Sequence, residues 1–290
     1  MSVDRVLFDA PGPRARRRTQ LVTVLSLVVI AAVVALALHQ FASNGQLAED
    51  RWSPFTHWPY IHFLLQGLRG TVVAAALGAV VAFPLGAVFA LLRLSQHRVL
   101  RWPATAYIEL FRAVPLLLLV YAFLLALPPY GVNLSTLWKL VVPIIIVNTA
   151  VLAEIFRAGV NALDRGQSEA AAAIGLSYGQ SMRLVVLPQA VRLVVPALVT
   201  QLVALLKDST LGYVVSYEEL MKQANNLTVY THLLVQTFLI VSVVYVLINA
   251  TISFLARQVE RRTARRVPGR PALPSAAAEG APETARLAMH

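Results

Sequence analysis

The sequence predicts an all-α membrane protein with about six transmembrane helices. Of its 290 residues, 58% are hydrophobic and only 13% are charged, whereas soluble domains carry about 25% charged residues. The apolar residues gather in six separate segments, and most lysines and arginines lie at the ends of these segments. A chain with so few polar side chains cannot cover itself with a polar surface, so we expect lipid around it.

The first apolar segment is Leu21–Leu38, which runs for 18 residues without a charge and is about long enough to span a bilayer. Residues 1–20 before it are polar and rich in arginine, as expected of a cytoplasmic N-terminus. A cleavable signal peptide is the alternative, but its apolar region is usually shorter, about 7–15 residues. We therefore expect a retained N-terminal transmembrane helix over residues 21–41.

Five further segments are expected to be spans: Thr71–Leu92, 104–127, 137–156, 191–208 and Leu233–Ala256. The fourth and fifth of the six have uncharged cores of only 14 residues, which suits helices that line a protein interior. Four spans contain an internal proline: Pro84, Pro115, Pro143 and Pro196. Because proline bends a helix, these positions predict either hinges or simple packing features.

The distribution of basic residues orients the spans. Of the 25 lysines and arginines, 19 fall on one side of the predicted topology and five on the other, with Arg112 inside a span. Cytoplasmic loops carry the excess of Lys and Arg, so both termini are expected in the cytoplasm. The tail 267–290 is rich in Pro and Ala and has no apolar period, which predicts a disordered cytoplasmic tail.

Several functions are excluded by what the sequence lacks. It has no cysteine, so disulfides and thiolate metal sites are excluded, and His39, His57 and His62 lie at an expected membrane interface without a metal-binding pattern. It contains no GxxxxGK[ST] or HExxH motif. The net charge of +11 follows membrane topology and does not indicate nucleic acid. We therefore expect no enzymatic activity, no metal and no cofactor of its own.

The loop between the fourth and fifth spans carries the most specific pattern. Residues 169–188 read EAAAAIGLSYGQSMRLVVLP. The alanine-rich start favours a helix, Gly175 suits a sharp turn, Ser177 can cap a second helix, and Pro188 is expected to end or bend that helix.

This pattern predicts a short amphipathic hairpin on the cytoplasmic side. Met182, Leu184 and Val185 are expected to face a partner, and Glu169 to cap the break or pair with an arginine. A surface hairpin without any partner is the alternative.

The loop resembles the EAA loop of permease subunits of ATP-binding-cassette importers. That pattern is EAA, three residues, Gly, nine residues, Ile, one residue and Leu-Pro, and this sequence has Val185 in place of the Ile. The other fixed positions are matched by Glu169, Ala170, Ala171, Gly175, Leu187 and Pro188.

Four further segments resemble the polar amino-acid branch of that family, the histidine/glutamine/glutamate permease-like proteins: 109–116, 154–159, 187–190 and 206–210. The resemblance covers residues 63–260, with the coupling loop at 164–190. It leaves the first span outside, because that branch typically has five spans per subunit.

The resemblance implies a type I importer permease fold with one extra N-terminal helix, in a bacterial cytoplasmic membrane. It also implies partners: ATP-binding subunits that hold the ATP and dock on the coupling loop, an extracytoplasmic substrate-binding protein, and a second permease subunit, identical or related. Polar amino acids, glutamate and glutamine among them, are the implied cargo, moved by alternating access.

Two pairs of opposite charges lie near the cytoplasmic ends of the third and fourth spans. Glu109 and Arg112 are three residues apart and can meet on one helix face, as can Glu154 and Arg157. Because a charge in lipid needs a partner, we interpret both as structural ion pairs that brace the bundle. Contact with substrate is the alternative.

Five other polar residues are candidates for the substrate pathway. Asn148 lies near the middle of the fourth span, and Thr200 and Gln201 near the middle of the fifth. Lys207 and Asp208 lie near its outer end, where adjacent opposite charges suit the two charged groups of an amino acid. Hydrogen bonds between helices, pairing of Lys207 with Asp208, or contact with a binding protein remain alternatives.

The sequence thus predicts the permease subunit of an ATP-driven importer. A permease of the same kind for another small solute is one alternative, and a membrane protein that works alone, as a secondary transporter or an embedded enzyme, is another. A solitary transporter usually shows repeated halves and more spans, and neither is found here.

Overall fold

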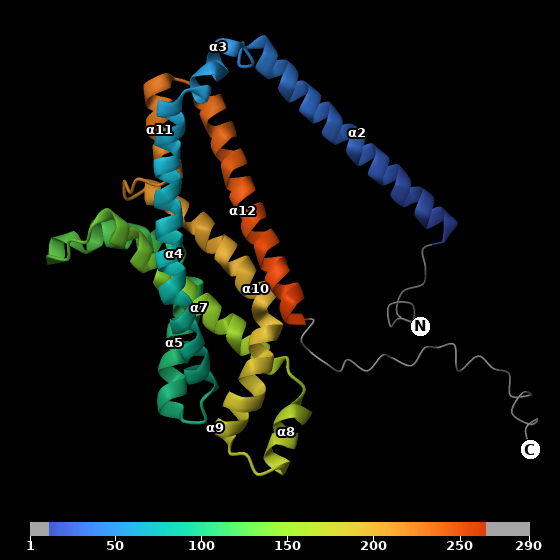
Figure 1. Cartoon of the computed structure of the whole chain (residues 1–290), viewed down its shortest axis with the longest axis vertical. Coiled ribbons are helices and arrows are strands. Elements are labelled where there is room, and N and C mark those ends of the chain that lie inside the picture. Colours follow the sequence, from blue (N-terminus) through green and yellow to red (C-terminus); the bar gives the residue numbers. More distant parts are fainter. Residues whose placement is uncertain (1–11, 265–290) are drawn as a thin grey trace, which may run out of the picture. The chain divides into compact units, whose positions relative to one another are not determined.

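The computed structural model describes residues 12–264, and within that range it contains helices and connecting loops but no strands. The chain forms two units, which we describe separately. The first contains the helix α2 (Pro13–Ser43), and the second extends from Glu49 to the end of the described residues (Figure 1).

From Leu21 to Leu38, helix α2 is apolar around its whole circumference. Pro13 stands at its first turn, where the missing N–H costs nothing because it would have no helical partner. Large side chains such as Leu21, Val28 and Leu36 are more than half exposed. A helix that is apolar all round needs lipid or protein on every side, which agrees with a span over residues 21–41. The helix continues back through the four arginines of residues 13–20.

The second unit contains the following helices in chain order: α3 (Glu49–Trp52), η1 (Ser53–Thr56), α4 (Trp58–Leu94), α5 (Arg98–Ala113), α6 (Leu116–Tyr121), η2 (Ala122–Ala126), η3 (Pro128–Tyr130), α7 (Thr136–Asn161), α8 (Arg165–Ala173), α9 (Tyr178–Ser181), η4 (Met182–Val186), α10 (Leu187–Asp208), η5 (Ser209–Tyr213), α11 (Leu220–Thr231) and α12 (Leu234–Ala264). By length and composition, five helices among the described residues are able to cross a membrane, and six if one bent pair counts as a span. The protein is therefore an all-α membrane protein, as the sequence predicts.

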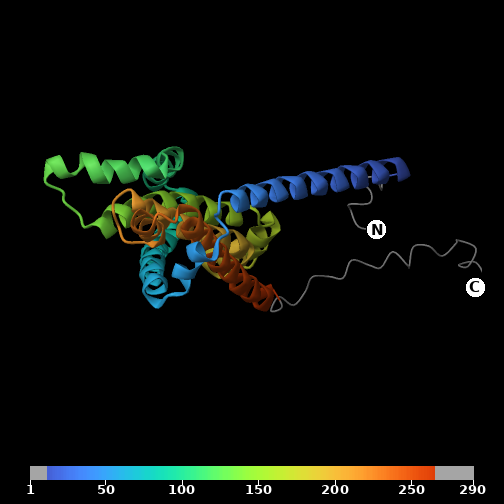
Figure 2. The ribbon, with the colours of Figure 1, turned by 90° about the horizontal axis from the view of Figure 1, so that it is seen from above.

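The third expected span, 104–127, is not one straight helix but a bent pair of helices. The chain bends by 96° between α5 and α6, where Val114 and Pro115 adopt extended backbone angles. Residues before a proline are pushed out of the helical region, so Pro115 begins a new helix in a new direction. In Figure 2 the green ribbon of this segment extends away from the rest of the second unit.

Helices α4 and α7 form the centre of the second unit, and small residues let them approach closely. At Gly86 of α4, a Cβ atom would lie 2.6 Å from the Cβ of Leu152 on α7. Any larger residue would push the helices apart, and close approach of this kind is how membrane helices associate. The adjoining core contains Ala74, Leu140, Ile144 and Leu205, which are fully buried.

Helix α11 is an element that the sequence analysis missed. It lies between the fifth and sixth expected spans and packs on α4 and α12. Its N-cap residue, Glu219, is fully buried. The Glu219 carboxylate accepts hydrogen bonds from the backbone N–H groups of Met221 (2.8 Å) and Lys222 (2.6 Å) and from the hydroxyl of Tyr245 on α12 (3.2 Å).

Glu219 lies in the segment between α10 and α12, outside the candidate spans. Burial raises its pKa from the ordinary value of 4.5 to about 7, while the three donated hydrogen bonds act in the opposite direction. The folded protein thus retains a proton on Glu219 that the unfolded chain releases at lower pH. The contribution of Glu219 to stability is therefore greatest below pH 4.5, declines as the pH rises to about 7, and stays at the lower level above.

We predict that Glu219→Gln, which keeps the shape but cannot ionise, removes this pH dependence. Between pH 5 and pH 8 the native protein should lose roughly 3 kcal/mol of stability that the variant retains, because one pKa unit is about 1.4 kcal/mol. Thermal unfolding midpoints in detergent at the two pH values measure the difference. Glu218→Gln, at the exposed neighbour, is the control, and equal pH dependence in all three proteins would contradict the assignment.

Candidate functional site

The loop predicted to be a hairpin consists of two helices with a tight break. Helix α8 is capped by Asp164, whose carboxylate accepts from the N–H of Gly166 at 2.8 Å. The break lies at Gly175, whose φ of +84° is a left-handed conformation that favours glycine. Ser177 then caps α9 in a capping box with Gln180, each side chain accepting from the other residue's backbone N–H.

The second helix of the hairpin does not end at Pro188, which was one of the two expected outcomes. The helix from Tyr178 continues through η4 and α10 to Tyr213. Pro188 lacks an N–H and its ring conflicts with the carbonyl four residues back, and the turn just before it widens to a π-helix in which Leu187 donates to the oxygen of Met182. The side chain of Gln189 donates to the oxygen of Val185 at 2.9 Å, so the helix passes the proline without breaking.

The outer surface of the hairpin is partly apolar. Ile174 is 77% exposed and Leu184 is 62% exposed. Met182 and Val185, which were expected beside Leu184 on the exposed face, are half-buried because the helix turns them back toward the hairpin interior. Glu169 is exposed, and neither the expected cap nor a pairing with an arginine is found among the described residues.

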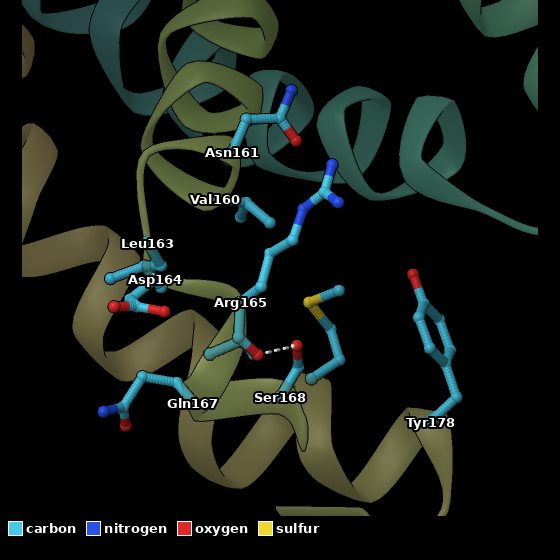
Figure 3. A pocket seen from close by; sticks show the side chains of 10 residues that line it. Val160, Asn161, Leu163, Asp164, Arg165, Gln167, Ser168 and Tyr178 are labelled. Carbon is cyan, nitrogen blue, oxygen red and sulfur yellow. Dashed lines mark hydrogen bonds between the residues drawn. The ribbon is translucent and has the colours of Figure 1, made fainter. Parts of the chain in front are cut away.

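A cleft of about 520 Å³ separates the hairpin from the end of α7 (Figure 3). Asn161 at the end of α7 forms one wall, and Arg165, Ser168, Tyr178 and Met182 of the hairpin line the other side. When the hairpin is counted up to Val186, three side-chain hydrogen bonds among the described residues join it to the other helices, and Gln189 of α10 donates two of them. Gln189 of α10 donates to the side chain of Gln167 at 3.1 Å, and the Tyr178 hydroxyl donates to the carbonyl of Leu94 at the end of α4 at 3.2 Å.

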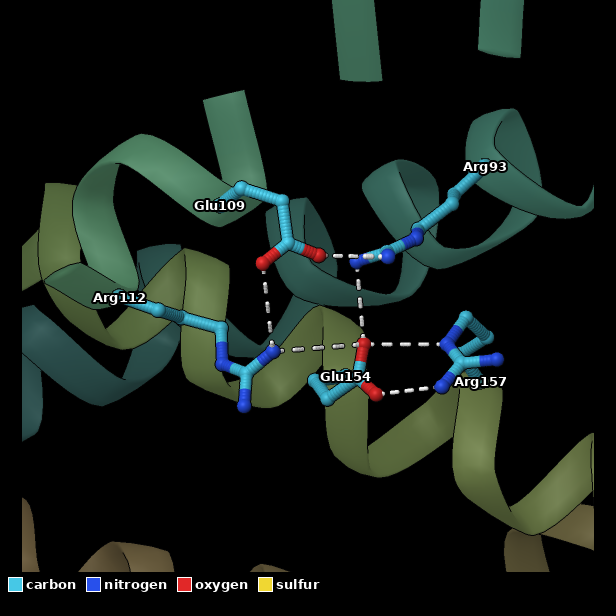
Figure 4. Close-up of polar contacts among 5 residues, drawn as sticks. All are labelled: Arg93, Glu109, Arg112, Glu154 and Arg157. Carbon is cyan, nitrogen blue, oxygen red and sulfur yellow. Dashed lines mark hydrogen bonds and ion pairs between the residues drawn. The ribbon is translucent and has the colours of Figure 1, made fainter. Parts of the chain in front are cut away.

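The two predicted ion pairs are joined into one network by a residue that sequence reasoning missed (Figure 4). Arg93, at the end of α4, contacts Glu109 of α5 at 2.6 Å and Glu154 of α7 at 3.1 Å. Arg157 contacts Glu154 at 2.5 Å, and Arg112 lies 3.9–4.0 Å from both carboxylates. The network therefore fastens three helices together at one end.

A second polar cluster lies between α7 and α10. Asn148 is fully buried. Its amide donates to the Asp208 carboxylate at 3.1 Å, and its oxygen accepts from the Gln201 amide at 2.5 Å. Thr200 is exposed and donates to the backbone of Pro196, and Lys207 is exposed and forms no ion pair with Asp208 within the described residues. The structure thus brings Asn148, Gln201 and Asp208 together. The other two candidates, Thr200 and Lys207, are not part of this cluster.

Comparison with known proteins places these features in a family. The family model of the binding-protein-dependent transport system inner membrane component matches residues 82–265. The glutamate transport system permease protein GluD of Corynebacterium glutamicum is 33% identical over 225 residues, which cover 76% of this chain and 82% of that protein. The arginine transport system permease protein ArtQ of Bacillus subtilis is also 33% identical, over 70% of this chain and 94% of its own.

Solved structures agree with the sequence relatives. The crystal structure of an amino acid ABC transporter with histidines is similar with a TM-score of 0.68 and 30% identity, over 70% of this chain and 95% of that one. The inward-facing MetNI methionine ABC transporter, at 23% identity and a TM-score of 0.59, shares the fold. The chain has the type I importer permease fold and belongs to the binding-protein-dependent transport system inner membrane components, as a permease of the polar amino-acid ABC importers.

Proposed function

We propose that this chain is the permease subunit of an ATP-driven importer for polar amino acids, with glutamate or glutamine as cargo, and that the hairpin 164–190 couples it to a separate ATPase. The observation that carries the proposal is the hairpin itself. It is capped at both helix starts, sharply turned at Gly175, and joined to α4, α5 and α7 by few side-chain hydrogen bonds. Such a piece moves as a rigid body when a partner pushes on it.

The exposed side of the hairpin suits docking on a protein. Ile174 and Leu184 are exposed apolar side chains of the hairpin, which also exposes the charged Glu169 and Arg183. We propose that two such hairpins, one from each of two permease subunits, sit in grooves of two ATPase subunits. ATP-driven closure of the ATPases then moves the hairpins and switches the pathway between outward and inward access, while a substrate-binding protein delivers cargo outside. ATP is bound by the partners, and this chain contributes no catalytic group. Both termini are cytoplasmic in this arrangement.

The ion-pair network provides a brace for that movement. Arg93, Glu109 and Glu154 tie the ends of α4, α5 and α7, so these ends move together when the hairpin moves. Partly buried charge networks of this kind resist shear because breaking one contact leaves a poorly solvated charge without its partner.

The cluster of Asn148, Gln201 and Asp208 is the proposed contact for cargo. Asp208 is half-buried and the described residues supply it with an amide donor and no cation. A carboxylate held this way within a bundle needs positive charge, and the ammonium group of an amino acid supplies it. A purely structural hydrogen-bond cluster between α7 and α10 is the alternative that the predictions below separate.

The first test is to purify the tagged chain from native membranes in mild detergent and to identify what accompanies it by mass spectrometry. We predict recovery of an ATP-binding subunit, and its loss when residues 169–188 are deleted. A chain that inserts normally but is recovered alone would favour a transporter that works by itself. Recovery of this chain as the single permease indicates that the second subunit is identical, whereas recovery of a different permease with it indicates a related second subunit.

Gly175 gives a sharper test of coupling. Gly175→Pro forbids the positive φ and removes the N–H that donates to Ala172 at 2.9 Å, so we predict that uptake is lost while membrane insertion is retained. Gly175→Asn should preserve most uptake because asparagine tolerates this conformation.

The control for Gly175 is Gly179→Ala. Both glycines have open space where a Cβ would be added, but only Gly175 has positive φ. Radiolabelled amino-acid uptake in proteoliposomes measures the effect. Normal uptake by Gly175→Pro would contradict the proposal that the hairpin couples the permease to the ATPase.

Asp208→Asn tests the cargo site. A hydrogen-bonded charge contact is worth about 1.5–3 kcal/mol, so we predict that the substrate concentration for half-maximal uptake rises roughly ten- to hundredfold. Lys207→Gln, at the exposed neighbour, should leave it unchanged. Equal half-maximal concentrations in Asp208→Asn and the native importer would return the cluster to a structural role.

A further inference from the structure

Tyr178 occupies an unusual position between two long helices. It is the first residue of the continuous helix Tyr178–Tyr213, and its ring stands at one end of the cleft, with the hydroxyl pointing away from α9 (Figure 3). That hydroxyl donates to the carbonyl of Leu94, the last residue of α4, at 3.2 Å. Two helices separated by more than eighty residues of sequence are thereby joined end to end.

The acceptor at Leu94 is a group that the helix itself leaves open. The last four carbonyls of a helix have no partner within it. At the end of α4, the Ser95 N–H returns to the oxygen of Leu92 at 3.2 Å, and the carbonyl of Leu94 accepts from Tyr178. The chain turns away directly afterwards, because Ser95 adopts an extended conformation. The bond thus holds α4 at its terminus, where a given force tilts the helix most.

Arg93 is the residue next to this contact, and it carries the ion-pair network. Its guanidinium contacts Glu109 on α5 and Glu154 on α7. A displacement of Tyr178 would therefore reach α5 and α7 through the peptide unit between Arg93 and Leu94 and through the Arg93 side chain. Elsewhere among the described residues, no hydrogen bond or ion pair joins the hairpin to α4 or α5.

We propose that Tyr178 is a positioning residue for transport: its hydroxyl acts as a strut that passes movement of the hairpin to Leu94 and, through Arg93, to the ends of α5 and α7. This inference rests on the proposed coupling role of the hairpin. Tyr178 touches neither ATP nor cargo in this role, and it acts only by linking two rigid parts.

The strut predicts a loss of coupling without a loss of assembly. Tyr178→Phe keeps the ring in place and removes one oxygen. A protein hydrogen bond shifts an equilibrium about two- to tenfold, so we expect the amount of amino acid taken up per ATP hydrolysed to fall by that factor. Recovery of the ATPase with the permease should be unchanged. A merely structural tyrosine would change the yield or thermal stability and leave this ratio as it was.

The experiment uses the whole importer, purified from native membranes and reconstituted with its binding protein in proteoliposomes that contain ATP. Uptake and phosphate release are measured together. Tyr230→Phe is the matched control, because it removes the same atom from an exposed side chain that makes no hydrogen bond within the described part of the chain.

Arg93→Gln and the double variant complete the test. If the strut acts through Arg93, the double variant should be no worse than the more impaired single variant, because both changes interrupt one line of contacts. An uptake-to-ATP ratio in Tyr178→Phe equal to that of the control, or fully additive effects in the double variant, would overturn the proposal.

One outcome assigns Tyr178 a different role. Loss of the ATPase from Tyr178→Phe during purification would make the tyrosine a docking contact and would overturn the strut. The proposed function fails separately, when the ATPase remains bound after residues 169–188 are deleted.

Discussion

The carboxylate of Glu154 is the point on which the arrangement of the helices depends. It lies within 4.0 Å of three arginines, one each from α4, α5 and α7. Charges near lipid are costly when alone, so each of these arginines gains by staying near the two carboxylates of the network. Hydrophobic packing cannot fix helix positions as strictly in a membrane, because lipid is as apolar as the side chains it replaces.

Close backbone packing complements the charges. Gly86 on α4 brings α7 within a distance that no larger side chain permits, and dispersion contacts over that short distance hold the pair. The packing sets how far apart α4 and α7 lie, while the Arg93–Glu154 pair sets their relative height and rotation at the end. The hairpin leaves α7 just beyond this fixed end, which gives its movement a firm base.

Local features of the fold were readable from the sequence, and contacts between distant residues were not. The turn at Gly175, the cap at Ser177 and the i,i+3 charge pairs all depend on residues a few positions apart, and their spacing is visible in the chain. Arg93 joins the network across 61 residues, which no local pattern reveals. Its position at the end of an apolar run made it look like an ordinary flanking charge.

The expectations that the structure changed share a physical cause. Hydropathy counts apolar residues without regard to backbone direction, so the run through Pro115 looked like one span although the chain turns there by 96°. Pro188 looked like a helix end because the widened π turn that accommodates it depends on a neighbour, Gln189, satisfying a carbonyl. The sequence analysis missed helix α11 because the helix is short and because its buried N-cap residue, Glu219, resembles a surface charge in the sequence.

Helix α7 connects the two polar regions of the bundle. Asn148, which faces α10 and Asp208, and Glu154, which faces α4 and α5, are six residues apart, about 9 Å along a helix that rises 1.5 Å per residue. Six residues also turn the helix by about 240°, which explains how one helix serves two different neighbours. Because a helix is stiff along its axis, a shift of the network end must carry Asn148 with it. The same helix then leads, after two residues, into the cap of α8, so the ion-pair network and the polar cluster lie along one rigid helix and the hairpin follows directly after its end.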